Sequence, residues 1–151
     1  MYIKIAKTRD VKTPVRANPF DAGMDFFIPN DYSGPTLLMH GQSVLIPSGI
    51  KVEVPVGRAL VFENKSGVAS KKKLDIMASV IDHAYAGEVH INLINNGMET
   101  IELHAGDKIA QAVMYVIDCP VVMEVPEDEL YQSIHVASAR GEGGFGSTGS
   151  N

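Results

Sequence analysis

The sequence contains a single cysteine, Cys119, no tryptophan and no long apolar run. One cysteine cannot form a disulfide within the chain, and its neighbours Asp118 and Pro120 offer no metal-binding spacing, so we expect Cys119 to be a small, semi-apolar filler. No stretch of about 18 apolar residues is present that could cross a membrane. The N-terminus MYIKIAKTRD also lacks the apolar run of a secretory signal. These absences favour a soluble intracellular, cytoplasmic protein with no membrane partner.

Basic residues are also in deficit, since 13 Lys and Arg against 18 Asp and Glu leave a formal charge of −5. Binding nucleic acid without sequence preference requires a basic surface, so this charge argues against a nucleic-acid partner. It does not argue against a small polyanionic ligand, which needs only a few local donors. The 151 residues, 45% of them hydrophobic, fit one globular domain that buries about 70% of the surface of its unfolded chain.

Apolar residues recur with a period of two, which is typical of half-buried strands. We expect short strands at 2–5, 50–54, 89–95, 100–103, 112–117 and 121–125, separated by turns rich in Gly, Pro, Asn and Asp. Many short strands at this spacing predict an all-β fold, that is, a sandwich, a barrel or a jelly roll. Only 66–72 is suited to a helical turn. The composition changes only in the glycine-rich segment 140–149.

The C-terminal segment combines an arginine, a phenylalanine framed by glycines and two adjacent hydroxyl residues: Arg140, Phe145, Gly146, Ser147 and Thr148. Glycine backbones can turn several N–H groups towards one anion. A guanidinium group suits phosphate, and an isolated aromatic ring can stack on a base. The segment lacks the Gly-Lys-Ser/Thr ending of a Walker A loop. A disordered polar tail is the alternative interpretation.

Two loops also carry residues suited to phosphate chemistry. The segment NKSG at 64–67 follows a strand and opens the helical turn, where free backbone amides, a cation and a hydroxyl can bind an anion. Ser66 could instead cap the helix. Asp82 lies in a predicted hairpin at 80–88, where a carboxylate could act as a general base, although aspartates are common in turns. The histidines show no metal-ligand spacing.

Together with two further segments, these regions resemble the trimeric dUTPase family along nearly the whole chain. The five family motifs occur in order as AGMDFF, NKSGVAS, SVIDHAYAGE, GDKIAQAVM and RGEGGFGSTG. The resemblance implies a β-jelly-roll protomer at 1–138, a flexible arm at 139–151, and a homotrimer in which each arm closes over a neighbour's site. It also implies hydrolysis of dUTP to dUMP and pyrophosphate with Mg²⁺ as cofactor, which keeps uracil out of DNA and supplies dUMP for dTMP synthesis.

The same resemblance implies roles for individual residues. Asp82 would hold the attacking water, Tyr85 would pack on the deoxyribose where a ribose hydroxyl does not fit, and Asp25 would contact waters on a Mg²⁺ ion held mainly by the triphosphate. The implied uracil contacts are Ser79, Val80, Ile81 and Asp82, with His90 on the return strand. The implied phosphate contacts are Lys65, Ser66, Gly67 and Gln111, and the implied lid is Arg140, Phe145, Gly146, Ser147 and Thr148, with Phe145 over uracil.

Besides Phe26 and Phe27, which replace the usual leucine after Asp25, three positions depart from the family pattern. Lys65 stands where arginine is usual, so a bidentate phosphate contact is lost there, while Ser79 replaces a glycine and Ile76 replaces a polar residue near the base. Two alternatives of other kinds stay open. One is a dCTP deaminase-like or bifunctional enzyme, which would need a catalytic glutamate in the hairpin's partner strand. The other is a dUTP-sensing regulatory protein that acts through a protein partner.

Overall fold

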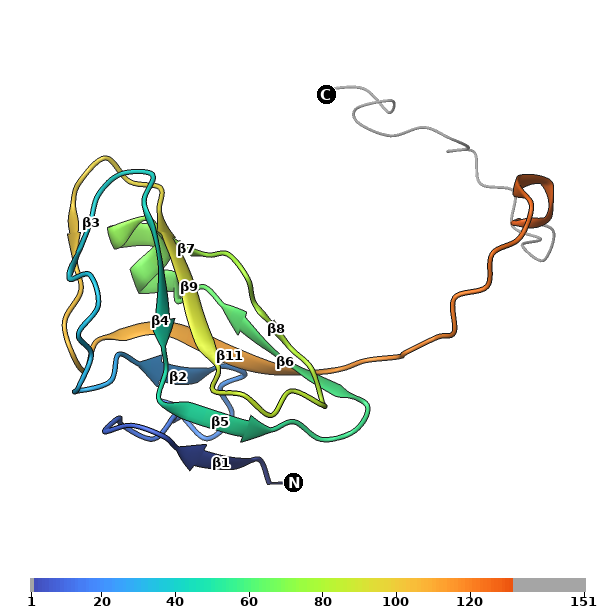
Figure 1. Cartoon of the computed structure of the whole chain (residues 1–151), viewed down its shortest axis with the longest axis horizontal. Coiled ribbons are helices and arrows are strands. Elements are labelled where there is room, and N and C mark those ends of the chain that lie inside the picture. The colour runs from blue at the N-terminus through green and yellow to red at the C-terminus, as the bar shows by residue number, and fades with distance from the viewer. Residues whose placement is uncertain (1, 132–151) are drawn as a thin grey trace. The chain divides into compact units, whose positions relative to one another are not determined.

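Short β-strands account for most of the regular structure in the computed structural model of the chain, which describes residues 2–131 (Figure 1). They are β1 (Lys4–Lys7), β2 (Met24–Phe27), β3 (Leu37–Leu38), β4 (Ser43–Pro47), β5 (Ile50–Glu53), β6 (Arg58–Glu63), β7 (Leu74–Ile76), β8 (Val80–Ile81), β9 (His90–Asn95), β10 (Ile101–Glu102) and β11 (Lys108–Val116). The helical segments are η1 (Val68–Lys72), wound as a π-helix, and the short 3-10 turn η2 (Glu127–Glu129). None of the described helices has the length and apolar character to span a membrane.

The residues up to 119 form one compact unit built from antiparallel sheets. The largest sheet has the order β2-β11-β6-β8 and a second has the order β4-β9-β7, while β1 pairs with β5 and β3 with β10. Burial alternates along the strands, so that Ile91 and Leu93 of β9 are buried and His90 is exposed. The buried faces enclose a core in which the rings of Phe26 and Phe62 meet edge to face, with centroids 4.9 Å apart. The all-β prediction is confirmed.

Strand pairing moves two of the predicted boundaries. The first strand covers Lys4–Lys7 rather than 2–5, because these residues pair with β5. β11 begins at Lys108 rather than at 112, because residues 108–112 pair with β2 although two of them are polar. Strands β2, β3, β4, β6, β7 and β8 lie outside the six ranges that the sequence indicates. The helical turn predicted at 66–72 is confirmed.

The segment 80–88 is not the simple hairpin that the sequence predicts. β7 and β9 pair as far as Met77, whose N–H donates to the carbonyl oxygen of Asn92 at 3.0 Å. The chain then leaves this sheet, and β8 pairs with β6, whereas β9 continues beside β4. The two strands therefore diverge into different sheets and leave a wedge between them.

Residues from 120 onwards belong to a second unit, of which 120–131 are described. The strand predicted at 121–125 is wrong, because this segment has no regular structure and Val121 and Val122 are each 94% exposed. A β-strand needs a neighbour to bond its N–H and C=O groups, and the described residues of its own unit supply none. The predicted arm, 139–151, lies outside the described residues, and its boundary stays a prediction.

Candidate active site

A pocket of about 210 Å³ occupies the wedge between β8 and β9. Its lining comes from both strands, from the segments before and after β8 and from two neighbouring strands: Leu45, Phe62, Ala78, Ser79, Val80, Ile81, Asp82, Tyr85, Val89, His90 and Asn92. The facing edges of β8 and β9 are not joined in a ladder within the described part of the chain. Their backbone groups can therefore bind the edge of a planar polar ligand, as unpaired strand edges do.

Asp82 and Tyr85 form the two ends of a tight turn that borders this pocket, since the Tyr85 N–H donates to the Asp82 carbonyl oxygen at 3.1 Å. The Tyr85 hydroxyl donates to the carbonyl oxygen of Glu88 at 2.8 Å, which fixes the direction of the ring. Gly87 leaves room for this ring, because a Cβ there would lie 2.5 Å from the tyrosine hydroxyl oxygen.

The carboxylate of Glu88 anchors the far end of the same loop. It accepts hydrogen bonds from the Gly49 N–H at 2.7 Å and from Arg9 Nε at 3.1 Å. Burial raises the pKa of Glu88, but the bonds from Gly49 and Arg9 outweigh burial and leave the pKa below its ordinary value. The loop therefore holds the exposed carboxylate of Asp82 at a defined place beside the pocket.

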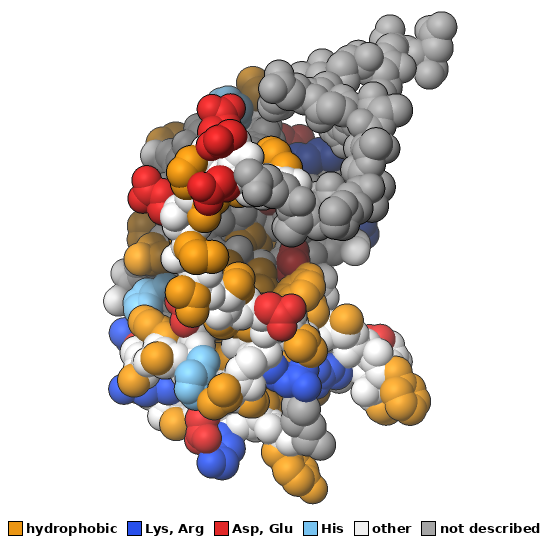
Figure 2. All heavy atoms as spheres, turned by 90° about the vertical axis from the view of Figure 1, so that its right-hand side faces the viewer, with side chains coloured by type: hydrophobic (Ala, Val, Ile, Leu, Met, Phe, Trp, Pro, Cys, Tyr) orange, Lys and Arg blue, Asp and Glu red, His pale blue; other side chains and the backbone are white. Residues whose placement is uncertain are grey.

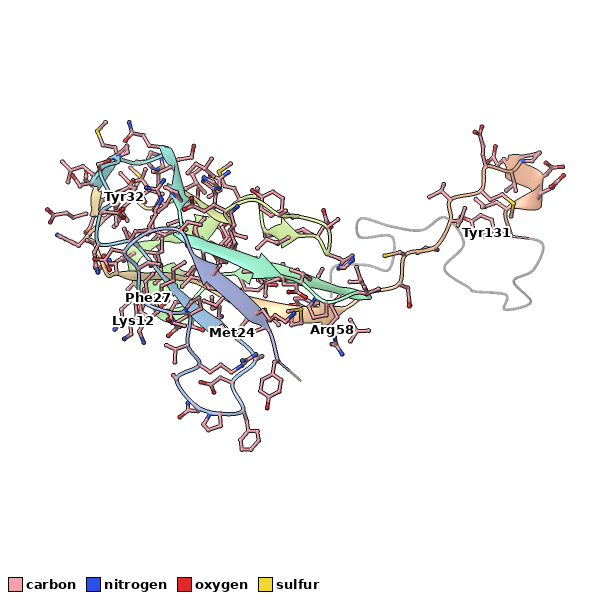
Figure 3. All side chains as sticks on the ribbon, turned by 60° about the horizontal axis from the view of Figure 1, so that its bottom comes forward. Lys12, Met24, Phe27, Tyr32, Arg58 and Tyr131 are labelled. Atoms are coloured by element: carbon pink, nitrogen blue, oxygen red, sulfur yellow. The ribbon has the colours of Figure 1, made fainter. Side chains whose placement is uncertain are left out.

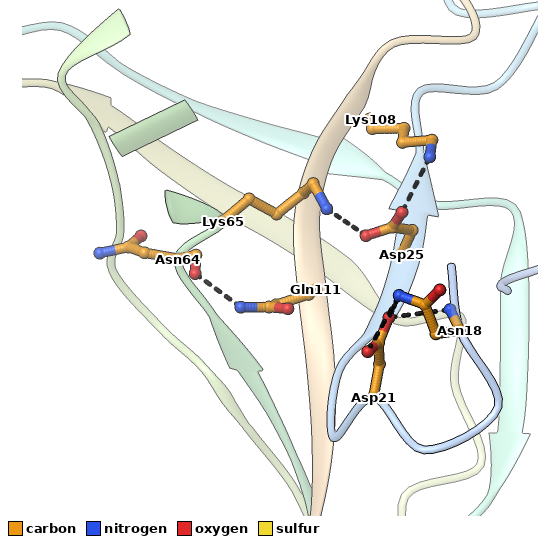
Figure 4. A network of polar contacts seen from close by, with 7 residues as sticks. All are labelled: Asn18, Asp21, Asp25, Asn64, Lys65, Lys108 and Gln111. Atoms are coloured by element: carbon orange, nitrogen blue, oxygen red, sulfur yellow. Dashed lines mark hydrogen bonds and ion pairs between the residues drawn. The ribbon is translucent and has the colours of Figure 1, made fainter. Parts of the chain in front are cut away.

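A second group of polar side chains surrounds Asp25 of β2, which is 5% exposed (Figure 4). Its carboxylate forms ion pairs with Lys65, from the loop after β6, and with Lys108 of β11, whose Nζ lies 3.0 Å from Oδ2. Burial raises the pKa of Asp25, but the hydrogen bonds and charges of the two lysines outweigh burial and hold the pKa below its ordinary value. Asp25 is therefore an ionised carboxylate in partly dry surroundings.

Cations also lie over the ring of Phe27, two residues after Asp25. The Nζ atoms of Lys12 and Lys108 lie 5.0 and 6.0 Å from the ring centroid, and Figure 3 shows Lys12 beside Phe27. Such contacts hold a cation through the electron-rich face of the ring. Together with Lys65, these lysines make a local excess of positive charge that suits a polyphosphate, although the whole chain is acidic.

Gln111 joins this cluster from β11 through its side-chain amide (Figure 4). Its Nε2 donates to the backbone carbonyl oxygen of Asn64 at 2.8 Å. The Gln111 side chain can lie here because residue 23 is glycine: a Cβ at Gly23 would lie 2.1 Å from Gln111 Oε1. Strand pairing also places Gln111 opposite both Asp25 and Glu63. Three of the five motifs, those containing Gly23, Asn64 and Gln111, therefore meet here.

The loop at Lys65–Gly67 opens the helical turn, as predicted. The Ala69 N–H donates to the Lys65 carbonyl oxygen at 2.8 Å, which starts the helical winding. Within the described residues no side-chain hydrogen bond caps this helix, so the structure does not support the capping role for Ser66. The space around Gly67 is open. The backbone amides of this loop are accessible to an anion.

The pocket and the charged cluster lie far apart within one chain. Asp25 and Glu63 are at the same level of the large sheet, because both pair with Gln111. Asp82 follows β8, whose last residue pairs with Leu60 of β6. The two carboxylates are thus separated by roughly four residues along β6 and three strand spacings, or about 20 Å in the geometry of a β-sheet.

The structure brings in residues that the sequence does not single out, namely Asn64, Asn92 and Lys108. The alternation of side chains along β9 could have indicated Asn92, because Asn92 lies on the same, less buried side of that strand as His90. Asn64 and Lys108 gave no such signal, because their importance comes from contacts with other strands. The predicted lid, Arg140, Phe145, Gly146, Ser147 and Thr148, lies outside the described residues.

The carboxylate of Asp25 is suited to a metal ion that binds together with the phosphates of a substrate. Among the described residues, no group of three or more His, Cys, Asp or Glu could hold a metal ion by itself. The carboxylate of Asp25 has more lone pairs than its two lysine partners use. It can therefore accept hydrogen bonds from water on an ion that phosphate oxygens otherwise bind, which is a common arrangement for Mg²⁺.

An all-β fold with a base-sized pocket and a lysine-rich cluster suited to phosphates defines an enzyme of the nucleotide-binding class. More specifically, the chain belongs to the dUTPase family, whose family model matches residues 9–149.

Individual members of the family are similar over most of their length. The deoxyuridine 5'-triphosphate nucleotidohydrolase of Clostridium tetani is 36% identical over 151 residues, which cover 99% of this chain and 96% of that protein. The structure of the Staphylococcus bacteriophage 80alpha dUTPase with dUPNHPP superposes with a TM-score of 0.79 at 25% identity and covers 99% of both chains. A variant dUTPase of S. aureus phage phi11 was solved to reveal the coordination of a structural Mg(II) ion; it has a TM-score of 0.73 at 25% identity and covers 84% of this chain and 98% of that one.

These relatives establish the activity as dUTP hydrolysis by a dUTP diphosphatase and agree with the all-β fold. Nothing in them favours the deaminase alternative.

Proposed function

We propose that a water molecule held by Asp82 attacks the α-phosphorus of dUTP and that dUMP and pyrophosphate are released. The exposed carboxylate of Asp82, on an anchored turn beside the pocket, is the observation that carries this proposal. The water oxygen forms a bond to the α-phosphorus while the bond to the bridging oxygen of pyrophosphate breaks, and the proton of the water passes to Asp82. Proton removal by a well-placed carboxylate contributes about 10²–10⁴-fold to the rate.

In this proposal uracil enters the wedge between β8 and β9. The backbone at Ser79–Asp82 and the residues His90 and Asn92 on the facing strand surround the pocket. A base bound by backbone donors and acceptors is distinguished from cytosine, because the wrong base leaves buried polar groups unpaired. The ring of Tyr85, held by its bond to Glu88, packs on the deoxyribose and excludes a 2′-hydroxyl.

The triphosphate is proposed to bind the loop Lys65–Gly67 and the amide of Gln111. Mg²⁺ bound to the phosphates would supply charge neutralisation, and Asp25 would accept a hydrogen bond from its water. The arm residues Arg140, Phe145, Gly146, Ser147 and Thr148 are proposed to cover the nucleotide, with Phe145 over the base. Closure of such a lid excludes bulk water and completes the set of phosphate contacts.

A complete site is proposed to need more than one chain. Asp82 acts at the α-phosphate and Asp25 at an ion on the same triphosphate, so one nucleotide cannot reach both across about 20 Å within one chain. A homotrimer with sites between subunits resolves this conflict. Exposed apolar side chains support association, as Val56 is 79% and Val116 75% exposed. Figure 2 shows such side chains among charges of both signs on one face.

Co-expression of two inactive variants tests the function and the shared site together. Asp25→Asn and Asp82→Asn should each be nearly inactive towards dUTP, whereas chains mixed at random should regain about one quarter of wild-type activity in a cyclic oligomer. Rescue arises because some sites then pair an intact Asp25 with an intact Asp82 of another chain. If mixed oligomers are verified by native mass spectrometry and show no rescue, both residues act within one chain.

A further inference from the structure

The loop between β6 and β7, residues 64–73, is closed at its neck by the side chain of Asn64. The Asn64 Oδ1 accepts a hydrogen bond from the Ile76 N–H at 2.9 Å, and its Nδ2 donates to Asp75 Oδ1 at 2.5 Å. Asn64 directly follows β6 of the four-stranded sheet, whereas Asp75 and Ile76 belong to β7 of the three-stranded sheet. One side chain therefore links the two sheets at the point where the loop leaves and returns.

The same residue also orients the phosphate-binding amide of the neighbouring strand. Its backbone carbonyl oxygen accepts the hydrogen bond from Gln111 Nε2 at 2.8 Å. The direction of that carbonyl is fixed because the Asn64 side chain is bonded on both of its polar atoms. A shift of Asn64 would thus move the amide of Gln111 and the next residue of the loop, Lys65, at the same time.

The remainder of the loop is also attached to other segments, through the ion pairs Lys65–Asp25 and Lys72–Asp107, the hydrogen bond from the Asn96 N–H to the Lys73 carbonyl oxygen at 3.0 Å, and the packing of Val68 against the core. Inside it, the Ala69 N–H donates to the Lys65 carbonyl oxygen at 2.8 Å and the Lys73 N–H to the Ala69 carbonyl oxygen at 3.1 Å, so the loop is compact. Lys73 has a left-handed backbone with φ of 56°, which is uncommon for a residue with a side chain and marks the return to β7. A compact loop with close ends takes its direction from whatever holds those ends together.

From this geometry we propose that Asn64 is a positioning residue for triphosphate binding. It closes the neck of the loop through its side chain and orients Gln111 through its carbonyl group. It does not touch the substrate in this proposal, which rests on the proposed binding of phosphates by Lys65–Gly67 and Gln111. Neither Asn64 nor its partners Asp75, Ile76 and Gln111 line the pocket proposed for uracil, so the influence of Asn64 should reach the phosphates and not the base.

The test compares two ligands that share the base and differ in their phosphates. In Asn64→Ala, the dissociation constant of the non-hydrolysable analogue α,β-imido-dUTP should rise by about 10-fold, as expected for loss of hydrogen bonds to a charged group and to a backbone amide. The dissociation constant of dUMP, which has no β- or γ-phosphate, should change little. The matched control is Asn96→Ala. In the wild type, Asn96 Nδ2 makes a long contact of 3.5 Å with the other carboxylate oxygen of Asp75, so this variant should bind both ligands like the wild type.

A second variant keeps the test decisive if Asn64→Ala folds poorly. Asn64→Asp retains an acceptor for the Ile76 N–H but places a negative charge against Asp75, so it should also weaken binding of the analogue selectively. An unchanged ratio of the two dissociation constants in both variants overturns the proposal. An equal loss for both ligands with a lowered Tm overturns it as well, since Asn64 would then be a purely structural residue. Failure of the wild type itself to bind the analogue would instead refute the proposed function.

Discussion

Lys65 and Asp25, which are 40 positions apart in the sequence, form an ion pair, and the carboxylate of Asp25 is almost completely buried. The family resemblance assigns Lys65 to phosphate binding and Asp25 to the water shell of Mg²⁺. Without substrate, these two groups therefore bind each other. Binding of a metal–triphosphate complex would bring a cation to the acid and an anion to the lysine. The substrate can thus replace both partners of this pair without leaving either charge uncompensated.

Replacing the second lysine of this cluster should destabilise the protein at neutral pH and have no effect in acid. The pKa of Asp25 is depressed in the folded state, so its ionised form adds stability above the unfolded pKa of about 4, and this contribution is lost as the pH falls through the folded pKa. Lys108→Met should cost about 1 kcal/mol at neutral pH, a modest loss because Lys108 is half exposed.

Urea unfolding over a series of pH values measures this effect. The difference from the wild type should vanish in acid, where Asp25 is protonated in both proteins, and a constant difference at every pH would exclude the proposed charge interaction. Lys4→Met is the control, since Lys4 and Glu53 form an exposed pair with side chains that are 77% and 66% accessible. It should leave stability almost unchanged at all pH values.

Asp82→Asn should preserve binding of α,β-imido-dUTP but reduce kcat by about 10²–10⁴-fold, because the amide cannot accept the proton of the attacking water. Steady-state kinetics and calorimetric titration provide the two measurements. Asp31→Asn, at another exposed turn aspartate, should behave like the wild type. A near-normal kcat for Asp82→Asn would remove Asp82 from the role of general base.

Tyr85→Ala should raise hydrolysis of UTP relative to dUTP, because the ring that excludes a 2′-hydroxyl is gone. The effect is read from the ratio of kcat/KM for the two nucleotides. Tyr85→Phe separates the ring from the hydroxyl, since it loses only the 2.8 Å bond to Glu88. This variant should keep most of the discrimination. Equal ratios in Tyr85→Ala and the wild type would contradict the sugar-filter role.

Phe62→Ala should destabilise the protein by about 3–5 kcal/mol, the usual cost of removing a large buried side chain. Phe62 is 2% exposed, packs edge to face on Phe26 and lines the pocket, so binding of dUMP should weaken as well. Phe20→Ala is the matched control, because Phe20 is fully exposed and its loss should change stability by no more than about 0.5 kcal/mol. Similar Tm values for the two variants would contradict this account of the core.

Local patterns were sufficient for part of this protein. The alternation of apolar residues predicts β9 almost to the residue, since successive side chains of a strand point to opposite faces and the sequence alternates in the same way. The helical turn after Asn64 was readable for a similar reason, because it depends on neighbouring residues only. The motif order pointed to dUTP hydrolysis because each motif keeps its chemical groups within a few consecutive positions.

Contacts between distant segments were decided only by the tertiary structure. β11 extends back to Lys108 because β2 pairs with it, and the segment 121–125 has no regular structure because the described residues of its own unit give it no neighbour. The wedge at β8 exists because this strand pairs with β6 rather than with β9. The sequence by itself determined the period of the strands and the chemical groups of the site. The roles of Asn64 and Lys108 depended on the fold, because a side chain acquires a hydrogen-bond or ion-pair partner only when pairing brings distant strands into register.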